Sequence, residues 1–168
     1  MHRLFEPESV AVVGATPKEG KVGNTLLKNI ISGFRGDVYP VNPSYTDILG
    51  FKCYPSILDL PEVDLAVIAV PAKAVIECLK QCSERGIKNT VVISAGFKET
   101  GREGALLESE LVKICRDYGI NLIGPNCLGI INTHLNLNAT FSKDVPPKGE
   151  IAFLSQSGAF IIAIIDWA

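Results

Sequence analysis

Short apolar runs rich in β-branched residues, each closed by glycine or proline, constrain the fold of this chain more than any other feature. Ser9-Val-Ala-Val-Val-Gly14 is the first, and Asp64-Leu-Ala-Val-Ile-Ala-Val70, followed by Pro71, is the clearest. Such runs are typical of strands buried on both faces by crossover helices. Two further runs, at 89–94 and 121–124, fit the same pattern. We therefore expect buried parallel strands at these positions.

Helical spacing fills the intervals between the strands. Apolar residues recur every three or four positions over 26–34 and again over 107–115, which is the period of one helix face. A further strand is predicted at 37–41, stopped by Asn42-Pro43 because proline cannot donate the next ladder hydrogen bond. This alternation implies an α/β fold, a Rossmann-like doubly wound parallel sheet with right-handed crossovers, in which 9–14 is the first, central strand.

The regular alternation ends near residue 130. Residues 131–149 are polar and irregular and are predicted to be a connector. The rhythm restarts with a strand-like run at 151–154 and an apolar helix at 159–168 that the chain end interrupts. We therefore expect one domain at 1–130 and the truncated start of a second α/β domain at 150–168.

Composition narrows the function classes. The 168 residues are 47 % hydrophobic and 20 % charged, with a formal net charge of -2, which provides no overall attraction for nucleic acid or an anionic membrane. Five cysteines, an odd number scattered through apolar surroundings, are the usage of a reducing cytoplasm. With no signal-peptide run and no membrane-length apolar segment, a cytoplasmic location is expected.

The loop Gly14-Ala-Thr-Pro-Lys-Glu-Gly-Lys-Val-Gly23 is the first candidate site. Its glycines let the backbone approach a phosphate, to which Thr16, Lys18 and Lys21 add a hydroxyl and positive charge. The alternative is a flexible turn that needs glycine only for its dihedral angles. The spacing departs from G-x-G-x-x-G, and Val41-Asn42 stands where a nicotinamide-dependent enzyme places an acid for the ribose. Both departures count against NAD.

Small residues end three other strands, at Val70-Pro-Ala72, Ser94-Ala-Gly-Phe97 and Gly124-Pro-Asn-Cys-Leu-Gly129. Ligands of open parallel sheets bind beyond the carboxyl ends of the strands, so these residues would leave a groove for a long, thin ligand. The equally favoured alternative is that small residues simply end the strands compactly.

Six segments together resemble the α part of ADP-forming acetyl-CoA and acyl-CoA synthetases, relatives of succinyl-CoA synthetase. The likeness covers essentially the whole chain, and each segment falls at a predicted strand end. The segments are Val13-Gly-Ala-Thr16, Tyr39-Pro-Val-Asn-Pro43, Val70-Pro71, Ser94-Ala-Gly-Phe97, Gly124-Pro-Asn-Cys-Leu-Gly129 and Leu154-Ser-Gln-Ser-Gly-Ala159.

The resemblance implies that the first domain binds coenzyme A, with the nucleotide end at the first loop and the pantetheine arm across neighbouring strand ends. Tyr45 stands where the succinyl relatives have lysine, so the charge for a CoA phosphate comes from Lys18 or Lys21. The implied CoA-binding residues are Gly14, Ala15, Thr16, Pro17, Lys18, Glu19, Lys21, Tyr45, Val70, Pro71, Ile93, Ser94, Ala95 and Gly96.

The same resemblance implies a phosphate site at Ser155, Gln156, Ser157 and Gly158, where a helix begins. From the residues alone, an ordinary serine N-cap is the better interpretation. The family relays its phosphate through a histidine in the second domain. Neither His2 nor His134 has a matching context, so no catalytic residue is assigned in this chain.

The cysteines are interpreted as structural. Cys78 and Cys82 are four residues apart on a helix, but no second pair has metal-ligand spacing, and a buried cysteine behaves as a small hydrophobe. Cys127 follows a strand end, yet no histidine or aspartate is placed in sequence to activate it. No metal site is expected.

The leading hypothesis is therefore the CoA-binding part of a ligase that interconverts acyl-CoA, ADP and phosphate with acid, CoA and ATP. An ATP-grasp β subunit or fused domain would bind ATP or ADP and Mg²⁺, and the fragment alone would be inactive. The alternative is a stand-alone CoA-binding or NAD(P)-binding regulatory module without catalysis.

Overall fold

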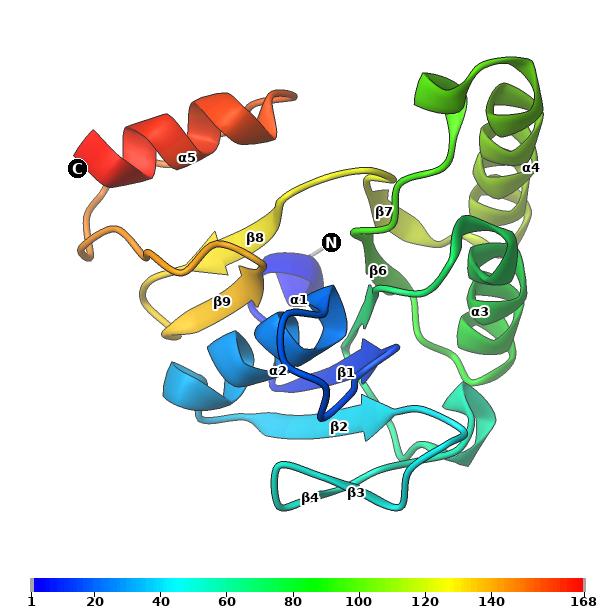
Figure 1. Ribbon diagram of the computed structural model, residues 1–168, viewed down its shortest axis with the longest axis horizontal. Helices are drawn as coiled ribbons and strands as arrows, with labels where there is room; N and C mark the ends of the chain where they lie inside the picture. The colour runs from blue at the N-terminus through cyan, green and yellow to red at the C-terminus, as the bar shows by residue number, and fades with distance from the viewer. Residues whose placement is uncertain (1, 168) are drawn as a thin grey trace.

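Five parallel strands form the central sheet of the computed structural model, which describes residues 2–167 (Figure 1). Their order is β2-β1-β5-β6-β7, so the Rossmann-like doubly wound sheet is confirmed. The strand predicted to be central, β1, lies inside the sheet between β2 and β5, but the middle position belongs to β5. The sheet strands are β1 (Ser9–Val13), β2 (Asp37–Val41), β5 (Leu65–Ile68), β6 (Asn89–Val92) and β7 (Asn121–Ile123).

Helices cover both faces of this sheet, as Figure 1 shows. In β1, Ala11 and Val13 face the layer of α3 and α4, whereas Val10 and Val12 face α2. All four side chains are buried, because a strand directs alternate residues to opposite faces. The helices are α1 (His2–Phe5), α2 (Val22–Gly33), α3 (Ala72–Glu84), α4 (Arg102–Tyr118) and α5 (Gly158–Trp167), with single 3₁₀ turns at Ile57–Asp59 and Lys98–Thr100.

Strand order reverses between β1 and β5. From β1 the chain crosses to β2 on one side, and it then returns to place β5 on the other side of β1. The helices that follow β1 and β5 therefore lie on opposite faces of the sheet. A crevice opens at such a reversal, beyond the carboxyl ends of the two strands.

A β-hairpin occupies residues for which the sequence predicted an irregular connector. Strands β8 (Gly129–Asn132) and β9 (Leu137–Thr140) pair antiparallel, and their buried side chains pack with those of α2. The prediction rested on the polar character of this stretch, which includes Asn138 and Thr140. Both are buried, and the Thr140 hydroxyl donates to Asn138 Oδ1 at 2.6 Å. A second small hairpin joins β3 (Asp47–Ile48) to β4 (Phe51–Lys52).

The strand predicted at 151–154 is not formed. Ile151 and Leu154 are each more than 90 % exposed, because no strand among the described residues lies beside them to complete a ladder. The apolar helix predicted at 159–168 is present as α5, with Ala168 outside the described residues.

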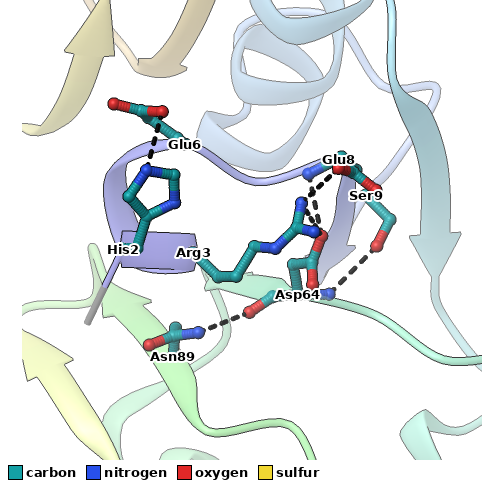
Figure 2. A network of polar contacts seen from close by, with 7 residues as sticks. All are labelled: His2, Arg3, Glu6, Glu8, Ser9, Asp64 and Asn89. Atoms are coloured by element: carbon teal, nitrogen blue, oxygen red, sulfur yellow. Dashed lines mark hydrogen bonds and ion pairs between the residues drawn. The ribbon is translucent and has the colours of Figure 1, made fainter.

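The amino end of the sheet is tied to α1 by the polar network in Figure 2. Arg3 pairs with Glu8 at 2.7 Å and with Asp64 at 3.6 Å, and the Glu8 N–H donates to the same Asp64 carboxylate at 2.8 Å. The Asp64 N–H donates to Ser9 Oγ, and Asn89 Nδ2 donates to the Asp64 carbonyl. This network joins the starts of β1, β5 and β6 at the edge opposite the crevice.

Candidate functional site

Two asparagine side chains hold the loop that connects β1 to α2. Asn42 Nδ2 donates to the Ala15 carbonyl at 2.8 Å, and the buried Asn24 donates from its Nδ2 to the Thr16 carbonyl at 2.9 Å. Asn42 stands at the end of β2, where the sequence lacks the acid of a nicotinamide site. Its amide instead fixes the loop, which is therefore shaped before any ligand enters.

Two glycines allow α2 to begin directly against the end of β1. A Cβ atom on Gly23 would lie only 2.0 Å from the Gly14 carbonyl oxygen, and Gly14 itself has a φ of +91°. The N-cap residue of α2, Lys21, makes no side-chain hydrogen bond to the helix start. N–H groups at an uncapped helix start are suited to bind an anion.

A cavity of about 410 Å³ opens beside this loop, and we call it the loop cavity. It combines two lysines with hydroxyl and amide groups, and Ser44 N–H donates to Asn42 Oδ1 at its rim. The lining residues are Gly14, Thr16, Lys18, Lys21, Val22, Gly23, Asn42, Ser44, Tyr45 and Ala69.

A second cavity, of about 600 Å³, lies over the ends of β5 and β6, and we call it the strand-end cavity. Its lining is mainly apolar, and α5 contributes to one wall. Val22 and Ala69 line both cavities, so the two adjoin. The lining residues are Val22, Ala69, Val70, Ile93, Ser94, Ala95, Asn126, Cys127, Leu128, Phe141, Gly158, Ala159 and Ile162.

Hydrogen bonds tie the strand ends beneath the second cavity to one another. Ser94 Oγ donates to the Val70 carbonyl at 2.5 Å, and the Asn126 N–H donates to the Ser94 carbonyl at 2.9 Å. Cys127 Sγ donates to the Val92 carbonyl at 3.3 Å. The segments after β5, β6 and β7 therefore form one connected floor.

The Glu99 carboxylate shapes the turn after β6 at the same edge of the sheet. Its Oε1 accepts hydrogen bonds from the N–H groups of Gly96 at 2.6 Å and Phe97 at 3.2 Å. These bonds, that from Gly96 foremost, lower the pKa of Glu99 because they favour the charged form. The turn is thus fixed by a negatively charged side chain from within the protein.

The structure brings ten of the predicted binding residues to the two cavities and leaves the others outside. Those that line the loop cavity are Gly14, Thr16, Lys18, Lys21 and Tyr45. Those that line the strand-end cavity are Val70, Ile93, Ser94, Ala95 and Gly158. Those that line neither are Ala15, Pro17, Glu19, Pro71, Gly96, Ser155, Gln156 and Ser157.

Local contacts account for two of the residues outside the cavities. Ala15 is fully buried in the core. Glu19 pairs with Lys28 at 2.9 Å, and the hydrogen bond from that lysine lowers the pKa of Glu19. Ser157 Oγ accepts a hydrogen bond from the Phe160 N–H, so Ser157 has the serine N-cap geometry that the sequence favoured on its own.

Sequence reasoning missed several lining residues. Ser44 lies directly after the quoted motif Tyr39-Pro-Val-Asn-Pro43, and Asn126 to Leu128 belong to a quoted motif without having been assigned to a site. Phe141 fell within the predicted connector, and no local pattern marked it. Ala159 and Ile162 reach the cavity because of where α5 lies, which depends on tertiary structure.

Neither histidine belongs to the cavities. His2, in α1, pairs at 3.1 Å with Glu6, which follows that helix. The His134 ring lies 3.2 Å from the Gly149 carbonyl. Among residues 2–167, no cluster of three or more His, Cys, Asp or Glu side chains is arranged to hold a metal ion. Over the same residues, no helix is both long and apolar enough to cross a membrane.

Burial raises the pKa of all five cysteine thiols, Cys53 included. It reaches about 11 for Cys78, Cys115 and Cys127 and about 12 for Cys82, because an apolar environment disfavours the thiolate. Of the five cysteines, Cys127 lines the strand-end cavity. With its thiol neutral and donating to a carbonyl, it is suited to packing rather than to nucleophilic attack.

Comparisons with known proteins connect this geometry to a family. Residues 8–133 match the family described as CoA binding domain. The chain is 60 % identical to acetate–CoA ligase [ADP-forming] I of Archaeoglobus fulgidus, over 100 % of this chain and 24 % of that protein. It is 47 % identical to acetate–CoA ligase [ADP-forming] I subunit alpha of Pyrococcus furiosus, over 99 % of this chain and 37 % of that subunit.

A solved structure agrees with these relatives. The dinucleotide-forming acetyl-coenzyme A synthetase 1 of Ca. Korarchaeum cryptofilum, in complex with phosphate and ADP, superposes with a TM-score of 0.92 at 46 % identity. The match covers 99 % of this chain and 36 % of that one. The chain thus spans 24–37 % of the length of these three proteins.

Proposed function

The chain belongs to the CoA binding domain family, and on this basis we propose that it is the CoA-binding part of an ADP-forming acyl-CoA synthetase. The whole protein would interconvert acyl-CoA, ADP and phosphate with the free acid, CoA and ATP. A phosphohistidine outside this chain would carry the phosphoryl group. An ATP-grasp β subunit or fused domain would bind ATP or ADP and Mg²⁺, in keeping with the name subunit alpha of the Pyrococcus furiosus relative.

The observation that carries this proposal is the pair of adjoining cavities at the strand-order reversal. One is lined by Lys18, Lys21 and the uncapped start of α2, and the other is mainly apolar. CoA has the same division, with phosphates at its nucleotide end and a thin pantetheine arm. The shared residues Val22 and Ala69 mark the passage between the two ends.

In this arrangement the loop cavity would hold the CoA phosphates. Backbone N–H groups at the start of α2 would donate to them, and Lys18 and Lys21 would add positive charge. The Thr16 hydroxyl and Tyr45 would contact the nucleotide end. Gly14 and Gly23 act by having no side chain, since a Cβ atom at either would collide with backbone atoms.

The strand-end cavity would hold the pantetheine arm and its thiol. Val70, Ile93, Ser94 and Ala95 line it, and their fixed hydrogen bonds would present a preformed surface. The role of this chain in the reaction is then to bind and orient CoA and to keep water from part of the arm. It supplies no group that exchanges a proton or forms a bond.

We further propose that Ser155 to Gly158, at the start of α5, is the phosphate-binding segment of the complete protein, and that the domain boundary follows the β8–β9 hairpin. Gly158 lines the strand-end cavity, which would bring the phosphate close to the CoA thiol. The Oγ atoms of Ser155 and Ser157 accept hydrogen bonds from the N–H groups of Ser157 and Phe160, and the hydroxyl protons of both serines would donate to the phosphate.

The test is calorimetric titration of the chain with CoA and with NAD under the same conditions. CoA should bind more tightly, because Asn42 holds the loop where a NAD site requires an acid for the ribose. NAD binding as tight as that of CoA would refute the proposal. Inorganic phosphate alone should bind only weakly.

The chain alone should show no synthetase activity. Acetyl-CoA, ADP and phosphate are incubated with it and ATP is followed, with the β part of a related ADP-forming synthetase added in a parallel reaction. Turnover by the chain alone would contradict the placement of the relay histidine outside it, and His134 would then be the first residue to replace.

A further inference from the structure

Phe141 is a large aromatic residue between two buried polar neighbours. Thr140 is 1 % exposed and Ser142 is 8 % exposed, whereas Phe141 is 41 % exposed and lines the strand-end cavity. A ring that faces a cavity from a rigid backbone offers apolar surface to whatever enters.

A buried network fixes the backbone on both sides of Phe141. Asn138 Nδ2 donates to the Ser142 carbonyl at 3.1 Å, and Asn138 Oδ1 accepts from both the N–H and the hydroxyl of Thr140. Thr140 Oγ1 in turn accepts from the Ser142 N–H at 3.0 Å. Every polar atom of these buried side chains has a partner, which is the condition under which such a network rigidifies a structure.

The network is anchored to the helix that begins at the loop cavity. Asn29, on α2, donates from its Nδ2 to the carbonyls of Thr140 at 2.8 Å and Ser142 at 2.7 Å. Both carbonyls that flank Phe141 are therefore bound to α2, whose first residue, Val22, lines both cavities. The position of the ring is thus coupled to that of the loop cavity through one helix.

We propose that Phe141 is a specificity-determining residue, whose ring provides the apolar surface against which the acyl group of an acyl-CoA packs; the proposal rests on the function proposed above. With the phosphates in the loop cavity, the arm enters the strand-end cavity, where Phe141, Leu128 and Ile162 add apolar side chains. Each additional methylene of the acyl group should then increase the affinity of the chain for the acyl-CoA. Asn29 and Asn138 act through Phe141 as positioning residues.

The test measures dissociation constants of CoA, acetyl-CoA and butyryl-CoA for the full 168-residue chain and for Phe141→Ala. One fully buried methylene is worth about fourfold in affinity, and butyryl-CoA has two more methylenes than acetyl-CoA, so it should bind the parent chain up to about fifteenfold more tightly. Phe141→Ala should reduce this ratio to within twofold. Phe141→Leu, which keeps an apolar side chain, should retain most of the ratio.

Phe5→Ala is the matched control, because Phe5 is similarly exposed, at 47 %, and lines neither cavity. Asn29→Ala should reduce the butyryl-to-acetyl ratio in part. If Asn29 had only a structural role, Asn29→Ala would lower the melting temperature and weaken the binding of all three ligands equally.

The outcomes separate this inference from the function on which it rests. Failure of CoA itself to bind the folded parent chain would refute the proposed function. If CoA binds and Phe141→Ala leaves the ratio as in the parent, lowers all affinities alike or increases the preference for butyryl-CoA, the assignment of Phe141 is wrong. It is also wrong if Phe141→Leu reduces the ratio to within twofold or lowers all affinities alike. Circular dichroism and melting temperature establish that each variant is folded, and Phe141→Leu decides if the alanine variant is not.

Discussion

A Cβ atom on Gly14 would lie 2.4 Å from the carbonyl oxygen of Ala69. Gly14 directly follows β1 and Ala69 directly follows the neighbouring β5, and Ala69 N–H donates to the Val13 carbonyl at 2.8 Å. This close contact lies where strand order reverses. The structure therefore has no room for a side chain at position 14.

Gly14→Ala should destabilise the fold and weaken CoA binding together. The φ of +91° strains any residue with a Cβ atom, and the contact with Ala69 is with rigid backbone. Gly20→Ala is the matched control, because Gly20 also has a positive φ, of +76°, but meets nothing within 4 Å. Denaturant unfolding should show Gly14→Ala to be about 1–3 kcal/mol less stable than Gly20→Ala. Equal stability would show that the close approach is not maintained in solution.

Gly23→Ala separates collision from backbone strain. Gly23 lies in the first turn of α2, where alanine is ordinarily favoured over glycine by about 1 kcal/mol. Its Cβ atom would lie 2.0 Å from the Gly14 carbonyl oxygen, so the variant should instead lose stability and at least tenfold in CoA affinity. Calorimetry and thermal unfolding measure the two effects. A variant more stable than the parent with unchanged CoA affinity would contradict the proposed site.

Lys21→Ala should weaken CoA binding about fivefold to twentyfold, since a hydrogen bond to a charged group is worth roughly 1.5–3 kcal/mol when buried and less at an exposed site. The affinity of the variant should also depend less steeply on salt concentration. Lys28→Ala is the charge-matched control, because Lys28 pairs with Glu19 and does not line the loop cavity. Equal losses from both substitutions would indicate only a general effect of charge.

Cys127 should be alkylated slowly at neutral pH. With a pKa of about 11, its thiolate fraction at pH 8 is about two orders of magnitude below that of a free cysteine with a pKa of about 8.5. Iodoacetamide labelling followed by mass spectrometry measures the rate, and the chain unfolded in urea is the control. Addition of CoA should slow the reaction further, because Cys127 lines the strand-end cavity. Labelling as fast as in urea would contradict this environment.

The buried cysteine thiols should make the fold less stable at alkaline pH. The pKa of Cys82 is raised from 9.0 to about 12, so between these values the unfolded chain loses its proton while the native chain keeps it. The contribution of the Cys82 thiol to the free energy of unfolding is therefore fully present below about pH 9, and it is lost as the pH rises toward 12. Urea unfolding at a series of pH values measures this, and Cys82→Ala should flatten the dependence.

Local sequence pattern was sufficient for the sheet. The strand predicted at 37–41 is present with those bounds, because Asn42-Pro43 ends it through a local effect of proline on the ladder. The β8–β9 hairpin was missed for a physical reason that pattern cannot show. Asn138 is polar in sequence yet buried, and its partners Thr140 and Ser142, two and four residues further along the chain, bond to it.

The candidate site was predictable where it rests on strand ends and not where it rests on distant contacts. Thr16 and Ser94 follow strands and could be placed from the order of elements alone. Phe141 reaches the strand-end cavity through bonds to Asn29, 111 residues away from Thr140 in sequence. No window of neighbouring residues contains that information.

The β8–β9 hairpin has a consequence for how this protein can be shortened. The family match ends at residue 133, but Leu137 and Ala139 of β9 are fully buried in the cluster that contains Leu26 and Ile30 of α2. A recombinant chain cut after residue 133 would leave that helix with an uncovered apolar stripe in water, a surface prone to aggregation. The smallest soluble unit should therefore extend at least through Ser142, so that β9 covers α2.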